Sequence, residues 1–176
     1  MIKVLSILLQ AFVLFSCNQN SNDNNFIKKR MSEIDIFIAK YSDTDFSEFK
    51  NSFIAIRQKD RNEVIYLVQR PENNLPVYFV TYDLQKKNIT DINRSMLEKN
   101  GVEDYYTDED IVNLVNLFRK YDFALLQVDN DNNVFINPFE INSPAILLRL
   151  NSETNEKTIK KGYVYTHYKN NWYVRK

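Results

Sequence analysis

The amino-acid sequence predicts an α+β fold: a single domain with a mainly antiparallel sheet of about eight strands and about three helices. Three observations favour this fold class. Segments rich in β-branched and aromatic residues follow one another in runs, which is typical of antiparallel sheets. Other segments carry apolar residues at helical spacing. The chain of 176 residues is 44% hydrophobic and 26% charged, so it can build one hydrophobic core.

The first expected elements of the domain are one helix and three strands. The helix carries apolar residues three or four positions apart: Ile27, Met31, Ile34, Ile38 and Tyr41. Two strands are predicted at residues 53–57 and 64–68, on either side of a polar turn at residues 59–62. A third strand is predicted at residues 77–82, after a loop that begins and ends with proline.

Two further helices are expected in the middle of the chain. Thr90 or Asp91 can cap a short helix that ends before Gly101, because glycine readily adopts the left-handed conformation that follows a helix. Thr107 is expected to cap the next helix, with three acidic residues at 108–110 in its positively polarised first turn. Four apolar residues should form its buried stripe: Ile111, Leu114, Val115 and Phe118.

The last third of the chain returns to strands. Five are predicted, at residues 123–128, 134–137, 146–150, 162–168 and 172–175. The two asparagines at 170–171 can form a two-residue hairpin turn, because asparagine tolerates positive φ. Such a turn predicts that Tyr168 pairs with Tyr173 and that His167 pairs with Val174.

The N-terminus has the pattern of a secretory signal peptide. Lys3 gives it a positive charge, and residues 4–15 are apolar apart from Ser6 and Gln10. About twelve helical residues rise only ~18 Å, which is short of the ~30 Å hydrocarbon core of a bilayer. We therefore expect residues 1–16 to be a signal peptide that is removed during export. The alternative is a buried N-terminal helix or strand.

The end of this segment reads Leu14-Phe15-Ser16-Cys17. It resembles the lipobox of bacterial lipoproteins, with Leu three positions before the cleavage site, a small residue directly before it and Cys after it. The resemblance implies that diacylglycerol is attached to the Cys17 thiol, that the chain is cleaved between Ser16 and Cys17, and that the new amino group is usually acylated. Two or three acyl chains, such as palmitate, would anchor the protein stably. Otherwise this single cysteine would be a buried thiol or would form an intermolecular disulfide.

The residues that follow the lipobox are expected to form a flexible tether. This tether is predicted at residues 17–25, because residues 18–25 are only Asn, Gln, Ser and Asp and offer nothing to a hydrophobic core. The folded domain is therefore expected to span residues 26–176. Asn18 stands where an aspartate retains many lipoproteins at the inner membrane, and this favours an outer-membrane location in the cell envelope.

Rare residue types exclude several classes of site. One His and one Cys cannot build the common zinc sites. Two separated glycines cannot form a phosphate-binding or dinucleotide-binding loop. A formal net charge of zero gives no support for nucleic-acid binding. We therefore expect no metal, no cofactor and no nucleic-acid partner, and no catalytic residue can be assigned.

Two polar clusters have an alternative functional interpretation. Residues 129–133 read Asp-Asn-Asp-Asn-Asn, as at the start of a calcium-binding loop. The sixth position, where such a loop needs glycine, is Val134, and Pro138 stands at the tenth, so a polar hairpin turn is favoured. The acidic residues at 103–104 and 108–110 could supply the paired carboxylates of a glycoside hydrolase, but helix capping accounts for the second group.

The C-terminal region is the most distinctive part of the domain because it is so aromatic. Its candidate binding surface consists of Tyr163, Tyr165, His167, Trp172 and Tyr173. Tyrosine and tryptophan are favoured at protein interfaces, although alternate rings on a strand can equally form the core face of a sheet. The sequence gives the single imidazole, His167, no recognisable catalytic partners, so a structural role is favoured.

These observations predict a lipid-anchored cell-envelope protein whose domain is a non-enzymatic protein-binding module. An inhibitor, an immunity-type protein or an accessory subunit of an envelope complex fits this description. Its expected partners are the membrane, through acyl chains on Cys17, and an envelope protein. The alternative is a small-ligand or glycan-binding protein, or a carboxylate-based glycan hydrolase of the envelope. That alternative requires a concave pocket, and the hydrolase would need at least two facing acids in it.

Overall fold

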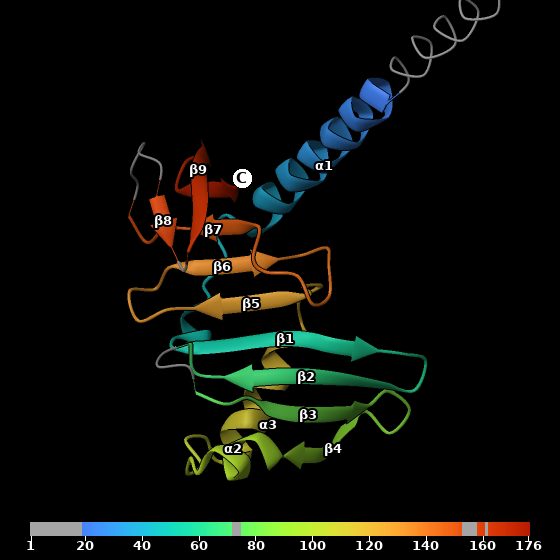
Figure 1. The fold of residues 1–176 in the computed structure, drawn as a ribbon, viewed down its shortest axis with the longest axis vertical. Helices are drawn as coiled ribbons and strands as arrows, with labels where there is room; N and C mark the ends of the chain where they lie inside the picture. The colour runs from blue at the N-terminus through green and yellow to red at the C-terminus, as the bar shows by residue number, and fades with distance from the viewer. Residues whose placement is uncertain (1–18, 72–74, 153–157, 161) are drawn as a thin grey trace, which may run out of the picture. The chain divides into compact units, whose positions relative to one another are not determined.

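The computed structural model describes residues 19–71, 75–152, 158–160 and 162–176 (Figure 1). The chain divides into two compact units, Met1–Thr44 and Asp45–Lys176. The predicted domain, residues 26–176, therefore contains the whole second unit and part of the first. The predicted signal peptide and the lipobox with its lipidation residue Cys17 lie outside the described residues.

The described part of the first unit is dominated by helix α1, Gln19–Tyr41. Ile34, Ile38 and Tyr41 of the predicted apolar stripe are buried. The predicted flexible tether, residues 17–25, overlaps the start of this helix at residues 19–25. Once an amphipathic segment has nucleated a helix, each added residue gains a backbone hydrogen bond at little further cost. In the described part of the chain, no helix combines the length and apolarity needed to cross a bilayer.

In the second unit, ten strands of the described residues form one sheet in which all neighbours are antiparallel (Figure 1). Their order across the sheet is β4-β3-β2-β1-β5-β6-β7-β10-β9-β8. The strands are β1 (Ser52–Lys59), β2 (Glu63–Gln69), β3 (Tyr78–Asp83), β4 (Asn88–Asn93), β5 (Leu125–Val128), β6 (Val134–Asn137), β7 (Leu147–Arg149), β8 (Thr158–Lys160), β9 (Tyr163–Lys169) and β10 (Trp172–Arg175). The predicted α+β class with a mainly antiparallel sheet is confirmed, with ten strands in place of about eight.

Strand β4 stands where the sequence predicts the start of a helix. Thr90 and Asp91, predicted as helix caps, lie within this edge strand, and helix α2 (Ser95–Asn100) begins after it. The β3–β4 ladder shifts its register here, so β4 contains one extra residue. Side chains on one face of a strand normally recur every second residue, and at a bulge the extra residue makes this spacing three. Ile89 and Ile92 therefore have a three-residue spacing that imitates a helix.

Helix α3 (Asp108–Phe118) forms as predicted, with Thr107 as its N-cap. Thr107 Oγ1 accepts a hydrogen bond from the backbone N–H of Asp110 at 3.2 Å, and Asp110 Oδ2 accepts one from the backbone N–H of Thr107 at 3.0 Å. The whole predicted stripe is buried: Ile111, Leu114, Val115 and Phe118. Phe118 meets Tyr66 of β2 edge-on, with ring centroids 6.0 Å apart, so α3 covers the face of the sheet that carries Tyr66.

Left-handed backbone occurs at Gly101 and at the first of the two asparagines in the predicted hairpin turn. Gly101, with φ of 63°, ends α2, and Asn170, with φ of 51°, lies in the turn between β9 and β10. Glycine lacks the Cβ that makes this conformation costly, and asparagine tolerates it better than most residues. Both local predictions are confirmed.

The register of the β9–β10 hairpin differs from the prediction by one residue. Tyr173 pairs with His167 instead of Tyr168, and Val174 pairs with Thr166 instead of His167. The ladder shifts directly after the turn, so that Tyr168 is an extra residue on β9. A two-residue turn fixes only the pair next to it, and this bulge changes every pair beyond.

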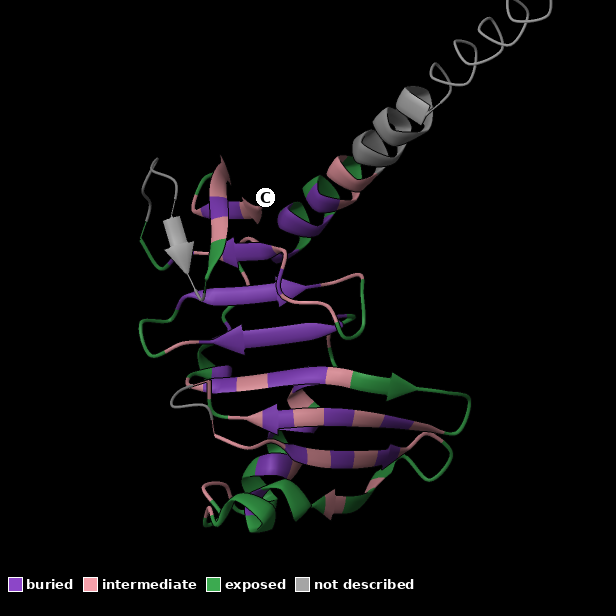
Figure 2. Cartoon of the chain, viewed as in Figure 1, coloured by how far each residue is buried: buried purple, intermediate pink, exposed green. Residues whose placement is uncertain are grey.

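Burial differs strongly from one part of the sheet to another (Figure 2). Residues of β2 and β3 alternate between buried and half-buried, and β4 has no buried residue. Every residue of β5 and β6 is buried. Strands that are buried at every position are covered on both faces. The sheet is therefore most completely buried at β5 and β6.

We expect Thr107→Ala to lower the free energy of unfolding by about 1 kcal/mol, because it removes the N-cap acceptor of α3. Urea denaturation of the full chain measures this change. Asn116→Ala, at an exposed position of the same helix, is the matched control and should not destabilise the protein, since alanine is the better helix former. Equal losses for both variants would contradict the capping role.

Candidate functional site

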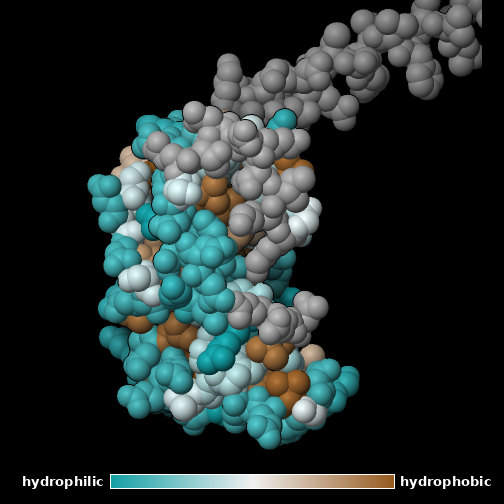
Figure 3. All heavy atoms as spheres, turned by 90° about the vertical axis from the view of Figure 1, so that its left-hand side faces the viewer, coloured by the Kyte–Doolittle hydropathy of each residue, from teal (hydrophilic) through white to brown (hydrophobic). Residues whose placement is uncertain are grey.

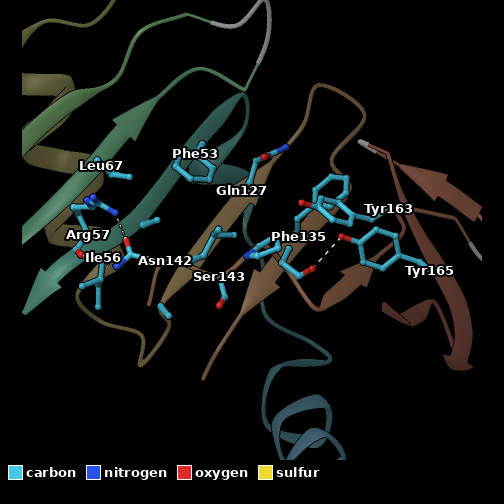
Figure 4. A pocket seen from close by; sticks show the side chains of 15 residues that line it. Phe53, Ile56, Arg57, Leu67, Gln127, Phe135, Asn142, Ser143, Tyr163 and Tyr165 are labelled. Carbon is cyan, nitrogen blue, oxygen red and sulfur yellow. Dashed lines mark hydrogen bonds between the residues drawn. The ribbon is translucent and has the colours of Figure 1, made fainter. Parts of the chain in front are cut away.

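A hollow of about 400 Å³ opens on the face of the sheet opposite to α3 (Figure 4). We call it the sheet pocket. Its lining comes from β1, β2, β5, β6 and β9 and from the loop between β6 and β7. The side chains are mainly aliphatic and aromatic, with a few polar groups at the margins.

Two rows of side chains form the floor and one wall of the sheet pocket. Ala55 of β1 pairs with Leu67 on one side and with Leu125 on the other, which gives a row across three strands. A second row lies two residues further along β1 and β5 and extends onto β6. It consists of Phe53, Gln127 and Phe135. Because residues two apart on a strand share a face, both rows point to the same side of the sheet.

The hollow exists because small side chains lie between large ones. Ala55, Ala124 and Ala145 all line the sheet pocket, and each is buried. An alanine leaves empty most of the space that a larger core residue would fill, and the larger Phe53 and Phe135 also line the pocket. The pocket is thus produced by missing side-chain volume in the middle of a closely packed sheet.

One buried side chain, Asn137 at the end of β6, shapes the loop that borders the pocket. Its Nδ2 donates to the carbonyl oxygens of Pro144 at 2.9 Å and Ser143 at 3.3 Å. Its Oδ1 accepts hydrogen bonds from the backbone N–H groups of Phe139 and Glu140 at 3.0 and 3.1 Å. Asn137 is only 1% exposed, so these bonds are shielded from water. The loop is therefore held in place from within.

Tyr165 ties β9 to the same loop. Its hydroxyl donates a hydrogen bond to the carbonyl oxygen of Ala145 at 3.2 Å (Figure 4). Burial raises the pKa of Tyr165 to about 12, so the hydroxyl keeps its proton and remains a donor at all physiological pH values.

Arg57 and Asn142 form the polar end of the pocket, with hydrogen bonds in both directions. Arg57 Nη1 donates to Asn142 Oδ1 at 2.9 Å, and Asn142 Nδ2 donates to the Arg57 carbonyl oxygen at 3.1 Å (Figure 4). Asn142 has φ of 62°, in the left-handed region. This loop conformation places its amide next to β1.

The five residues of the predicted aromatic surface do not share one environment. Tyr163 and Tyr165 line the sheet pocket, and Tyr163 is 43% exposed. Tyr165, Trp172 and Tyr173 are buried. Trp172 pairs with Arg149, whose guanidinium lies 5.7 Å from the tryptophan ring centre. Adjacent residues of a strand point to opposite faces, so Trp172 does not share the face of Tyr173.

His167 is half-buried beside this group. Its ring meets Tyr173 edge-on at 5.4 Å between centroids, and its Nε2 lies 2.7 Å from the carbonyl oxygen of Asn170 in the hairpin turn. These contacts fix the imidazole to its own hairpin. They agree with the structural role that the sequence favours.

The acidic cluster is engaged in local structure. Arg94 Nε contacts both carboxylate oxygens of Asp104, at 3.0 and 3.1 Å, and Arg94 Nη2 contacts Asp108. Asp110 caps α3, and the hydrogen bond from the Thr107 backbone holds the pKa of Asp110 below its ordinary value of 3.8. A lowered pKa is the opposite of what a general acid in glycoside hydrolysis needs.

Residues 129–133 form the predicted polar turn, between β5 and β6. Asp129 Oδ1 accepts hydrogen bonds from the backbone N–H groups of Asp131 and Asn133, at 3.0 and 2.8 Å. Asp129 Oδ2 accepts a third, at 2.9 Å, from the Asn133 side chain. The carboxylate that would begin a calcium loop thus organises its own turn.

The sequence places Phe53, Ala55, Arg57 and Phe135 only in predicted strands, and it gives Asn142 no role. The sheet pocket collects residues from segments that lie far apart in the chain, so no linear motif marks it. Alanine within a predicted strand is the one available signal, since small residues are less common there. That signal does not say which face of the sheet is hollow.

Comparison of the chain with protein-family models, with curated protein sequences and with solved structures found no match.

We expect Tyr165→Phe to lower the free energy of unfolding by about 1 kcal/mol, because it removes a buried hydrogen bond to the Ala145 carbonyl. Tyr163→Phe removes a hydroxyl from an exposed ring and is the matched control, with little expected effect. Urea denaturation of the full-length variants measures both changes. A stable Tyr165→Phe protein would show that this bond does not hold the loop.

Proposed function

We propose that this chain is a lipid-anchored cell-envelope protein that binds a small, largely apolar ligand in the sheet pocket. One observation carries the ligand-binding part: a concave site of about 400 Å³ with mainly apolar and aromatic walls and a few polar groups. Small-molecule sites are typically of this kind, with volumes of roughly 300–1,000 Å³. Of the alternatives that the sequence leaves open, this geometry supports small-ligand binding best.

The lining argues against a carboxylate-based hydrolase at this site. Among the described residues that line the sheet pocket, none is Asp or Glu. Hydrolysis of a glycosidic bond uses two carboxylic groups on either side of the sugar. Asp104 and Asp108, at a separate surface site, are both engaged with Arg94. A binding function therefore fits the pocket better than catalysis.

A protein partner is the second candidate, and two exposed apolar residues favour it. Tyr163 is 43% exposed and Ile141 is 39% exposed, and Tyr163 lies at the margin of the pocket. The side of the molecule seen in Figure 3 is mainly hydrophilic, with hydrophobic side chains in small separate patches. Burial of three members of the predicted aromatic surface leaves less area for a partner than the sequence suggests.

The proposed anchor rests on the sequence Leu14-Phe15-Ser16-Cys17 and on its place at the end of a short apolar segment. Lipidation would use the chain's one cysteine. Asn18 directly after that cysteine supports a location at the outer membrane over one at the inner membrane. A lipid-anchored protein works close to a reservoir of apolar molecules, which agrees with an apolar binding site.

The ligand-binding proposal is tested by filling the hollow. Ala55→Phe places a ring in the floor of the sheet pocket and should weaken binding of Nile red, a neutral apolar fluorophore, by at least about tenfold. Ala39→Phe makes the same change at an exposed alanine of α1 outside the pocket lining, and it should bind like the wild type. Fluorescence titration of the purified full-length proteins gives the dissociation constants.

Circular dichroism and urea denaturation show whether Ala55→Phe remains folded. If a folded Ala55→Phe protein bound Nile red as tightly as the wild type, the sheet pocket would not be the binding site. Absence of saturable binding to the wild type would likewise count against the proposal.

The anchor is tested by metabolic labelling. Cells that express the full chain and are fed labelled palmitate should incorporate label into the wild type and not into Cys17→Ala, because the thioether requires the thiol. Membrane fractionation should show the same difference. Equal labelling of the two proteins would overturn lipidation at Cys17.

A further inference from the structure

A β-bulge delivers Arg57 to one end of the sheet pocket. In the β1–β2 ladder, Ile56 pairs with Tyr66 and Gln58 pairs with Ile65, so Arg57 is the extra residue without a partner in the ladder. Bulges often occur next to functional sites, where they re-aim a side chain. Here the bulge allows consecutive residues, Ile56 and Arg57, to line the same hollow.

The Arg57 side chain is exposed and is hydrogen-bonded to the loop between β6 and β7. Asn142 forms hydrogen bonds with both the guanidinium and the carbonyl group of Arg57, at 2.9 and 3.1 Å. One of its terminal nitrogens, Nη1, is used in this way. A guanidinium has five N–H donors in a planar fork, so further donors remain for a second acceptor.

The charge at this end of the pocket has no protein counter-ion among the described residues. Arg57 forms no ion pair with any of them, and it is the only charged side chain in the described lining. Arg94, in contrast, is paired with two aspartates. A positive charge next to apolar walls is complementary to a ligand with an anionic group at one end of an apolar body.

We propose that the ligand of the sheet pocket is a single-chain carboxylate amphiphile, with its carboxylate on Arg57 and its hydrocarbon chain crossing the strands from Leu67 of β2 to Phe135 of β6. This inference rests on the proposed ligand-binding function and adds the chemical class and the orientation of the ligand. A carboxylate matches the planar fork of arginine and can form two parallel hydrogen bonds with it.

The dimensions of the pocket suit a chain of medium length. The lining crosses β2, β1, β5 and β6, which are four adjacent strands. Three spacings of ~4.8 Å make about 14 Å. An extended hydrocarbon chain covers this distance with roughly eleven bonds, since each ~1.5 Å bond advances the chain by a little over ~1.2 Å. Dodecanoate is therefore the probe of choice.

The first experiment compares three probes on the wild-type full chain by isothermal titration calorimetry. Dodecanoate should bind at least about tenfold more tightly than its neutral methyl ester, because only the carboxylate forms the charge-assisted contact. Dodecyltrimethylammonium, with a cationic head, should bind more weakly than the ester. High salt should weaken dodecanoate binding and leave the ester unchanged.

The second experiment assigns the charge to a residue. Arg57→Met keeps an apolar stem of similar length and should reduce dodecanoate affinity to that of the ester, with ester binding unchanged. Arg61→Met, in the exposed β1–β2 turn, is the matched control and should behave as the wild type. Arg175→Met tests whether the carboxylate binds at the other end of the pocket instead. There the Arg175 guanidinium lies 5.0 Å from the Tyr163 ring centre.

Each outcome separates this inference from the function on which it rests. Equal affinities for dodecanoate and its ester would overturn the carboxylate assignment and leave an apolar binding site in place. Loss of dodecanoate binding in Arg175→Met, with Arg57→Met unaffected, would overturn the proposed orientation. If no probe bound, or if Ala55→Phe left all affinities unchanged, both the inference and the proposed function would fail.

Discussion

The register between β1 and its two neighbours is the constraint on which the candidate site depends. Ala55 lies between Leu67 and Leu125 only because both ladders are aligned at that position. A slip of one residue on β1 would turn Ala55 to the face covered by α3 and would bring Ile54 into the pocket. The hollow, the walls around it and the position of Arg57 all follow from this alignment. The buried packing of β5 and β6 holds it in place.

Much of the fold could be predicted because its signals are local. The N-cap at Thr107, the stripe of α3 and the left-handed positions at Gly101 and Asn170 each depend on a few neighbouring residues. Most strands were predicted for the same reason. The errors occur where pairing with another strand inserts an extra residue, as in β4 and at Tyr168. A bulge is a property of two strands together, so one segment alone does not reveal it.

The candidate site could be predicted much less well. The sequence draws attention to large aromatic residues, and two of them, Tyr163 and Tyr165, do line the pocket. Trp172 and Tyr173 are buried parts of the sheet instead. The hollow itself comes from alanines, and a missing side chain leaves no chemical signature in a sequence. Asn137 and Asn142 likewise become meaningful only when the loop after β6 is seen against β1.

The complete burial of β5 and β6 makes their assembly the hazardous step for this chain. Their hairpin can form early, because a turn of five residues joins the two strands and carries its own hydrogen bonds. Until β1 and β7 add on either side, the hairpin presents two open edges with apolar side chains on both surfaces. Such a ribbon pairs readily with copies of itself, so aggregation competes with folding at this stage. Substitutions that delay the addition of β1 should therefore lower the yield of soluble protein even where the finished sheet tolerates them.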